Sequence, residues 1–348
     1  MEPGAEIHAL PKAELHLHLD GSLRPDTALE LAAESGMALD IDEARRRMVA
    51  PERCADQGQL LSFFDLPIAL LQTADALRRS TAELVADLAA ERIRYAELRW
   101  APRLHLERGL EVGDVIEAVA AGIARAAGTL GERTPLVGLI VTAMRSHPPA
   151  ANVELARIAG EFGPPVVGFD LAGPEALFPA PPHAAAFRAA ESAGLALTCH
   201  AGEVPGPERV REALELGVAR VAHGVTAIDD DSVLAAVRAA DVTLDLCPTS
   251  NVQAGIVPSL EAHPLAALHR AGVSVTLNTD DRTVSGTSLS REMERTAAAL
   301  SLSRATLAAI AVNAFHRGFA PRHVLDPLID SAARAWNAWA EEAAPAGA

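Results

Sequence analysis

The chain has 348 residues, of which 49% are hydrophobic and 22% are charged. Its 46 acidic residues outnumber its 30 basic ones, so the formal net charge is −16. A field of this sign repels phosphate backbones and anionic membrane surfaces, and no apolar run reaches the roughly 20 residues that a membrane helix needs. We therefore expect a globular protein with neither nucleic acid nor a membrane as its partner.

The N-terminal sequence lacks the basic segment followed by an apolar one that marks a secretory signal. The three cysteines, Cys54, Cys199 and Cys247, are odd in number and widely spaced, which favours neither a disulfide framework nor a CxxC zinc or redox site. We expect these cysteines to be buried thiols and the protein to be cytoplasmic.

Short apolar runs recur along the chain, and each is followed by an alanine-rich segment with helical spacing. In chain order the runs are ELHLHLDG (14–21), RYAELRWAP (94–102), LVGLIVTAM (136–144), VVGFDLAG (166–173), LALTCHAGE (195–203), RVAHGV (220–225), VTLDLCPTSN (242–251) and VSVTLNTDD (273–281). This alternation predicts a parallel sheet with crossover helices, and about eight strands close a (β/α)8 barrel of typically ~250 residues. We predict an α/β fold of the TIM-barrel type, in one domain over residues 1–348.

A doubly wound open sheet would show the same alternation, but no GxGxxG sequence follows an early strand and too many runs end in polar residues. The connection over residues 22–93 is too long for one crossover helix, so we predict extra helices there. Its apolar cluster at residues 60–66 either forms a lid over the barrel mouth or packs against the outer helices. The tail at about 341–348 is predicted to be disordered.

Two histidines, His16 and His18, lie one residue apart in the first run. Side chains alternate along a strand, so both imidazoles point to one face while Leu15, Leu17 and Leu19 point to the other. Taken alone, the pair is either a metal-chelating pair or two core histidines that are satisfied by hydrogen bonds.

Polar residues at the ends of later runs favour the metal. His200, His223 and Asp280 end the fifth, sixth and eighth runs, and the active site of such a barrel forms at the C-terminal ends of its strands. Three histidines and a carboxylate suit Zn²⁺, which leaves a position for water when it is catalytic. Glu203 would face the same cavity, where partial desolvation raises the pKa of a carboxyl enough for it to donate a proton near neutral pH.

The motifs HxHxDG, HAGE, AHG, CPTSN and NTDD, in this order, resemble the adenosine deaminase family of the metal-dependent amidohydrolase superfamily. The resemblance covers roughly residues 11–319. It implies a zinc enzyme with one Zn²⁺ per chain and a small purine nucleoside as its partner. The implied reaction is hydrolytic deamination of a 6-aminopurine nucleoside, with adenosine or 2'-deoxyadenosine favoured, to give inosine or 2'-deoxyinosine and ammonia.

The resemblance also implies roles for single residues. His223 matches the histidine that positions the attacking water and helps to take its proton, and Glu203 matches the acid that protonates purine N1. The matching zinc ligands are His16, His18, His200 and Asp280.

Three further residues match substrate contacts of the family: Asp281 the contact to purine N7, Gly173 the backbone contact to N3, and Asp20 a contact to the ribose hydroxyls. The chain departs from the family pattern at Pro174, where an acidic residue is common, so this loop can meet the base edge differently. NTDD replaces the NTDN of many bacterial relatives, so the N7 contact is a carboxyl that needs a proton in order to donate.

Other readings stay open at this point. Relatives deaminate adenine, 5'-modified adenosines or aminodeoxyfutalosine, although NTDDRTVSGTSL is more similar to the nucleoside-acting members than to the adenine-acting ones. A binuclear amidohydrolase would need a carboxylated lysine on the fourth strand, yet Lys12 is the only lysine. A cytidine-deaminase site would need PCxxC, which is absent. A nucleoside-binding barrel without turnover would lack a catalytic group, and none is missing. The sequence does not indicate an oligomeric state.

Overall fold

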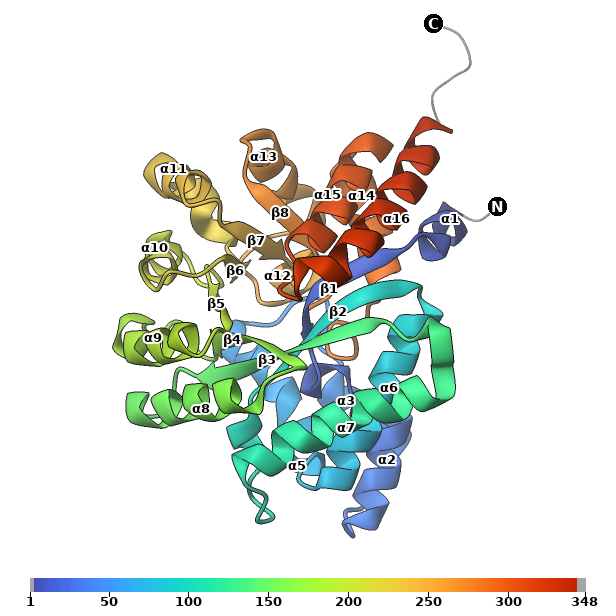
Figure 1. Cartoon of the computed structure of the whole chain (residues 1–348), viewed down its shortest axis with the longest axis vertical. Coiled ribbons are helices and arrows are strands. Elements are labelled where there is room, and N and C mark those ends of the chain that lie inside the picture. The colour runs from blue at the N-terminus through green and yellow to red at the C-terminus, as the bar shows by residue number, and fades with distance from the viewer. Residues whose placement is uncertain (1–2, 343–348) are drawn as a thin grey trace, which may run out of the picture.

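The computed structural model describes residues 3–342, and the statements below concern that part of the chain. Its centre is an eight-stranded parallel sheet whose strands, β1 to β8, follow one another in chain order (Figure 1). The last strand returns to the first, because His18 N donates to Asp280 O at 2.8 Å and Asp280 N donates to His16 O at 3.0 Å. The sheet therefore closes into a barrel, which confirms the predicted (β/α)8 class.

Each predicted run overlaps one strand, and the seventh and eighth runs extend furthest beyond the ends of their strands. The seventh strand ends at Leu246 because Pro248 begins a helix, where its fixed φ suits the first turn. The eighth ends at Leu277, and Asp280 lies in the following loop with a φ of 64°. The strands are β1 (Lys12–His18), β2 (Ile93–Trp100), β3 (Leu136–Met144), β4 (Val166–Ala172), β5 (Ala196–Ala201), β6 (Arg220–His223), β7 (Thr243–Leu246) and β8 (Ser274–Leu277).

The register of β1 is irregular where it matters for the site. β2 and β3 pair without interruption from Tyr95 opposite Leu136 onward. By contrast, β1 shifts its register against β2 between Glu14 and Leu17, the segment that contains His16. Such irregularities are common at barrel rims, where they re-aim side chains.

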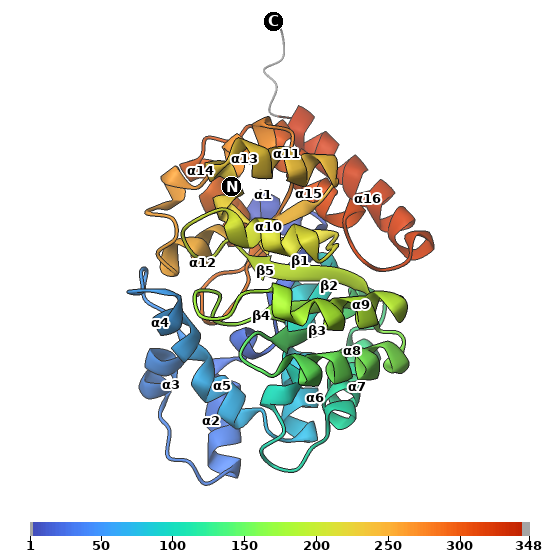
Figure 2. The ribbon, with the colours of Figure 1, turned by 90° about the vertical axis from the view of Figure 1, so that its left-hand side faces the viewer.

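The predicted extra helices are present between β1 and β2. In Figure 2, α3, α4 and α5 lie on the same side of the molecule as α12 (Pro248–Gln253), the helix that follows β7. The contact is direct, because Cys54 N donates to Gln253 O at 2.8 Å. This segment therefore covers the end of the barrel where the strands finish. Its helices are α2 (Pro25–Glu34), α3 (Ile41–Met48), α4 (Gln57–Leu61), α5 (Asp65–Leu70) and α6 (Ala74–Ala90).

The other helices surround the strands (Figure 1). Of the helices that the structure describes, none is long and apolar enough to cross a membrane. The last helix continues to Glu341, into the start of the tail predicted to be disordered, while 343–348 lie outside the described residues. These helices are α1 (Pro3–Ala9), α7 (Val112–Leu130), α8 (Pro149–Phe162), α9 (Ala184–Ser192), α10 (Glu208–Glu215), α11 (Asp231–Ala239), α13 (Leu265–Arg270), α14 (Leu289–Ala299), α15 (Arg304–His316) and α16 (Arg322–Glu341).

The barrel interior contains charge as well as apolar side chains. Arg220 pairs with Glu97 and, at 2.8 Å, with Asp245. Arg99 lies 3.4 Å from Asp170, and all five side chains are at most 1% exposed. Buried charges are tolerated when they are paired in this way. The three cysteines are buried and free, as expected.

Candidate active site

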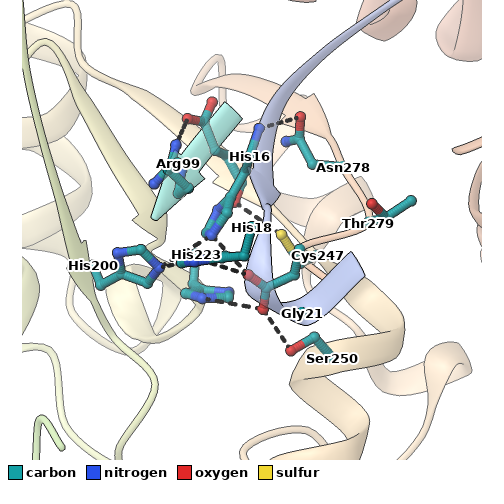
Figure 3. Close-up of polar contacts among 12 residues, drawn as sticks. His16, His18, Gly21, Arg99, His200, His223, Cys247, Ser250, Asn278 and Thr279 are labelled. Atoms are coloured by element: carbon teal, nitrogen blue, oxygen red, sulfur yellow. Dashed lines mark hydrogen bonds and ion pairs between the residues drawn. The ribbon is translucent and has the colours of Figure 1, made fainter. Parts of the chain in front are cut away.

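Four side chains predicted from the sequence meet at the C-terminal end of the barrel. Figure 3 shows the imidazoles of His16 and His18 from β1 and of His200 from β5 turned toward one another. His200 Nε2 lies 3.1 Å from His16 Nε2 and 3.2 Å from His18 Nε2. Asp280 Oδ1 lies 2.8 Å and 3.3 Å from the same two histidine nitrogens.

These spacings fit a divalent metal ion. Four ligands arranged tetrahedrally at ~2.0–2.1 Å from one ion lie about 3.3 Å from each other. The second ring nitrogen of His200 and the second carboxylate oxygen of Asp280 each have a polar partner. His200 Nδ1 is 3.0 Å from Asp170 Oδ2, and Ser250 Oγ donates to Asp280 Oδ2 at 2.7 Å. These contacts leave His200 Nε2 and Asp280 Oδ1 directed at the common centre, which is the arrangement that orients metal ligands.

Burial also favours the form of histidine that binds a metal. It lowers the pKa of His16 well below the ordinary imidazole value, and it lowers the pKa of His200 and His223 as well. All three rings are therefore neutral near pH 7, and the neutral imidazole is the ligand form.

His223 and Asp280 have unusual backbones. Their φ angles of 68° and 64° lie in the left-handed region, which costs a residue with a side chain on the order of 1–3 kcal/mol and is concentrated at functional sites. His223 ends β6 and Asp280 lies in the loop three residues after the end of β8, and both side chains line the cavity at the barrel mouth. His223 Nε2 lies 3.3 Å from Glu203 Oε1 and 3.7 Å from Asp280 Oδ2.

Glu203 is the carboxyl predicted to donate a proton. Burial is the main cause that raises its pKa, which keeps more of the group protonated at neutral pH. The backbone of its loop is held by Glu175, whose carboxyl accepts from Gly202 N at 2.9 Å and Glu203 N at 2.8 Å. The chain therefore has a loop-fixing carboxylate directly after Pro174, the position where it departs from the family pattern.

A cavity of about 290 Å³ opens above these groups, near the lower end of the ~300–1,000 Å³ typical of small-molecule pockets. Its lining includes the predicted substrate contacts Asp20, Gly173 and Asp281, and among residues 3–342 neither an arginine nor a lysine lines it. Burial, followed by the charges of Asp280 and Asp20, raises the pKa of Asp281 well above its usual range. The Asp281 carboxyl thus retains the proton that a hydrogen-bond donor needs.

The apolar cluster at residues 60–66 divides between the two predicted roles. Leu60, Leu61 and Phe64 line the cavity, and the Phe64 ring lies 6.3 Å from that of His18. Leu66 instead belongs to the main core and is 1% exposed. One side of the cluster therefore lines the cavity, and the other side packs into the core.

Sequence reasoning missed several residues that support the site. Gln57, in α4, lines the cavity, and its Oε1 accepts from Glu175 N at 3.2 Å across 118 residues of sequence. Its amide also bonds the Glu203 carboxyl and so opposes the effect of burial on that group's pKa. No local pattern signals such a contact. Asp170 did have a signal, because a lone carboxylate within an apolar strand needs a buried partner.

The structure also bears on the alternative metal chemistries. Lys12 lies at the start of β1, where its Nζ donates to the carbonyls of Ile7 at 3.0 Å, His8 at 3.1 Å and Leu10 at 2.8 Å. It is thus unable to bridge two metals at the other end of the strand. The side chains of a second group have the spacing of metal ligands: His16, His223 and Cys247. Burial raises the pKa of the Cys247 thiol well above the ordinary value.

Comparison with known proteins agrees with this geometry. The family model described as adenosine deaminase matches residues 11–335. An adenosine deaminase of Mycobacterium sp. (strain KMS) is 40% identical over 344 residues, which cover 93% of this chain and 94% of the relative.

Solved structures are similar over almost the whole chain. An adenine deaminase from Arthrobacter aurescens superposes with a TM-score of 0.87 at 28% identity, covering 96% of this chain and 100% of that one. The N6-methyl-AMP deaminase from Arabidopsis thaliana gives 0.84 at 29% identity, covering 95% and 99%. An amidohydrolase from Burkholderia ambifaria with bound Zn gives 0.85 at 27% identity, covering 96% and 94%.

Proposed function

The chain belongs to the adenosine deaminase family and is a hydrolase of carbon–nitrogen bonds, and we propose that it deaminates adenosine and 2'-deoxyadenosine with one zinc ion per chain. The observation that carries this proposal is the juxtaposition of two groups. A largely buried acid, Glu203, lies 3.3 Å from His223, and both face the cavity over the cluster of His16, His18, His200 and Asp280.

The lining of the cavity favours a nucleoside over a nucleotide. A 5'-phosphate carries about −1.5 to −2 charges at pH 7, but the ionisable side chains in the lining are histidines and carboxyls, without arginine or lysine. A buried phosphate without a cationic partner is costly. We therefore infer that the nucleotide substrate named for the Arabidopsis relative is a poor substrate here.

Free adenine and 5'-modified nucleosides are the remaining alternatives. Adenine would leave Asp20, the proposed ribose contact, without its partner, which is unfavourable for a buried polar group. A 5'-deoxy or 5'-thio group would meet the apolar lid residues Leu61 and Phe64. Nucleosides modified at this position, aminodeoxyfutalosine included, thus stay as the second candidate substrates.

The proposed mechanism assigns one task to each side chain. Zinc, when bound by His16, His18, His200 and Asp280, supplies the Lewis acidity that lowers the pKa of a water toward neutrality. Glu203 donates its proton to purine N1, which draws electron density away from C6. His223 orients the attacking water. The water oxygen adds to C6, one proton of the water passes to the amino group, which leaves as ammonia, and the other returns to the Glu203 carboxylate. The base becomes the 6-oxo form and keeps the proton on N1.

The substrate is held by three more groups in this proposal. Asp281, in its protonated form, donates to N7, the backbone N–H of Gly173 meets N3, and Asp20 binds the ribose hydroxyls. We further infer a single-domain cytoplasmic enzyme that acts on a small molecule. The net charge of −16 supports the inference that neither a nucleic acid nor a membrane is its partner.

Glu203→Gln tests the proposal. The amide fills the same space but has no acidic proton, so we expect kcat to fall by ~10²–10⁴-fold, while metal content and inosine binding stay as in the wild type. Glu132→Gln, at an exposed position, is the matched control. Near-normal turnover by the Glu203 variant would reject the assigned role.

The substrate is tested by comparing kcat/KM for adenosine, 2'-deoxyadenosine, adenine, 5'-methylthioadenosine, AMP and aminodeoxyfutalosine. We expect the two unmodified nucleosides to lead. A clear lead for AMP would overturn the inference from the cavity lining. A clear lead for aminodeoxyfutalosine would keep the deaminase chemistry and replace the substrate.

A further inference from the structure

A chain of hydrogen bonds runs from the backbone of α13 to His223. It begins with Leu265 N, which donates to His263 Nδ1 at 3.2 Å. An imidazole nitrogen that accepts a hydrogen bond carries no proton, so the proton of a neutral His263 is on Nε2. Burial lowers the pKa of His263 to about 3, and the ring is neutral at physiological pH.

The direction of this first bond determines the next two. His263 Nε2 lies 3.1 Å from Asn251 Oδ1, to which it donates. The Asn251 amide then presents its Nδ2 to His223 Nδ1 at 3.0 Å. Because an amide nitrogen only donates, His223 Nδ1 is the acceptor. The proton of a neutral His223 must therefore be on Nε2, the atom that faces the cavity.

The relay of hydrogen bonds formed by His263, Asn251 and His223 is buried and rigid. His223, Asn251 and His263 are only 1%, 1% and 3% exposed, so water does not compete for these bonds. The backbone of Asn251 is held at both ends, since its N–H donates to Cys247 O at 2.9 Å and its carbonyl accepts from Val257 N at 3.2 Å. His223 Nε2, by contrast, has no hydrogen-bond partner among the described residues and points to the reacting centre.

We propose that Asn251 and His263 are positioning residues that keep His223 in the tautomer with its proton on Nε2, so that His223 orients the attacking water by donating to the water oxygen. The inference rests on the proposed function. It also revises the role that the resemblance implies, because a neutral His223 in this tautomer has no lone pair on Nε2 with which to take the proton of the water.

The first test is a spectrum of the wild-type protein. Imidazole ¹⁵N shifts distinguish protonated from unprotonated nitrogens, and the His223 signals are assigned by their loss in His223→Gln. We expect Nε2 of His223 to be protonated and Nδ1 to be unprotonated, in the metal-free and the zinc-loaded protein alike. A His223 with its proton on Nδ1 overturns the proposal without any variant of the relay.

The second test reverses the direction of the hydrogen bond between residue 251 and His223. In Asn251→Asp the side chain only accepts, so the proton of His223 should move to Nδ1. The ¹⁵N signal of Nδ1 should then be that of a protonated nitrogen, and the signal of Nε2 that of an unprotonated one. The loss of one oriented donor should lower kcat by ~10²–10³-fold, with KM changed less than threefold. Unchanged ¹⁵N signals together with unchanged kcat would refute the proposal.

Controls separate positioning from stability and from the proposed function. Asn313→Asp makes the same substitution in α15, where Nδ2 donates to Val275 O at 2.9 Å, and should lower stability while kcat stays unchanged. His263→Gln retains a donor for Asn251 and should keep most of kcat, whereas His263→Leu should lose it. Equal kcat for these two variants contradicts the relay. Failure of the proposed function would appear separately, as near-normal turnover in Glu203→Gln.

Discussion

Replacement of Gly21 by alanine should disable the proposed N7 contact without removing any functional group. Gly21 is the glycine of the HxHxDG motif, and its backbone lies against the Asp281 side chain. A Cβ at this position would lie 1.8 Å from Asp281 Oδ1 and 2.6 Å from its Cγ. Ordinary contacts begin near ~3.5 Å, so the carboxyl has to retreat by roughly 1.5 Å or more.

The size of the effect follows from this displacement. Overpacking of a filled site costs about 1–3 kcal/mol, which in a chain of this length lowers Tm by about 1–4 °C. Loss of the bond leaves the buried N7 without a donor, which costs ~1–3 kcal/mol, so kcat/KM should fall by roughly 5–150-fold. Metal content should not change, because the zinc ligands themselves keep their positions.

Steady-state kinetics, metal content and thermal melts of Gly21→Ala test this reasoning. Gly128→Ala is the control, because a Cβ at that exposed helical position meets nothing within 4 Å. A double-mutant cycle with Asp281→Ala should show strong non-additivity, since the second change removes what the first displaces. Wild-type kcat/KM in Gly21→Ala, or additive losses in the cycle, would refute the argument.

Three further predictions concern groups around the site. Asp170→Asn removes the carboxylate that orients His200 and should weaken zinc binding by ~10–100-fold; competition with a chelator measures this, and unchanged affinity contradicts it. Gln57→Leu removes a bond that lowers the Glu203 pKa. Because Glu203 has to be protonated to donate, the alkaline limb of kcat/KM should move to higher pH, and a limb that stays in place or moves lower contradicts the assignment. Arg220→Met leaves buried carboxylates unpaired and should lower the free energy of unfolding by ~3–5 kcal/mol, as urea titration would show; an unchanged midpoint contradicts it.

Several features were predictable because they depend on local periodicity. Alternation along β1 places His16 and His18 on one face and Leu15 and Leu17 on the other, and both leucines are fully buried. The strands, their parallel order and the C-terminal rim follow in the same way from the alternation of apolar runs with helical segments. The sequence therefore predicted that the four clustered groups of the candidate metal site lie at one rim of the barrel.

The ends of β7 and β8 were less predictable because local and tertiary forces differ there. CPTSN continues an apolar run, yet Pro248 starts a helix. NTDD continues another, yet Asp280 takes a left-handed conformation that only its surroundings stabilise. Strand propensity is a weak guide where a functional loop begins.

The sequence alone determined the fold class, the identity of the clustered histidines and carboxyls, and the family, because each depends on residue types at short and regular spacings. Only the tertiary structure decided how these groups are held. The Gln57 contact to Glu175 spans 118 residues, and the relay from His263 through Asn251 joins side chains from two segments to His223 on a third. Such contacts depend on how separate segments pack in three dimensions, and the spacing of residues along one chain contains no direct record of that packing.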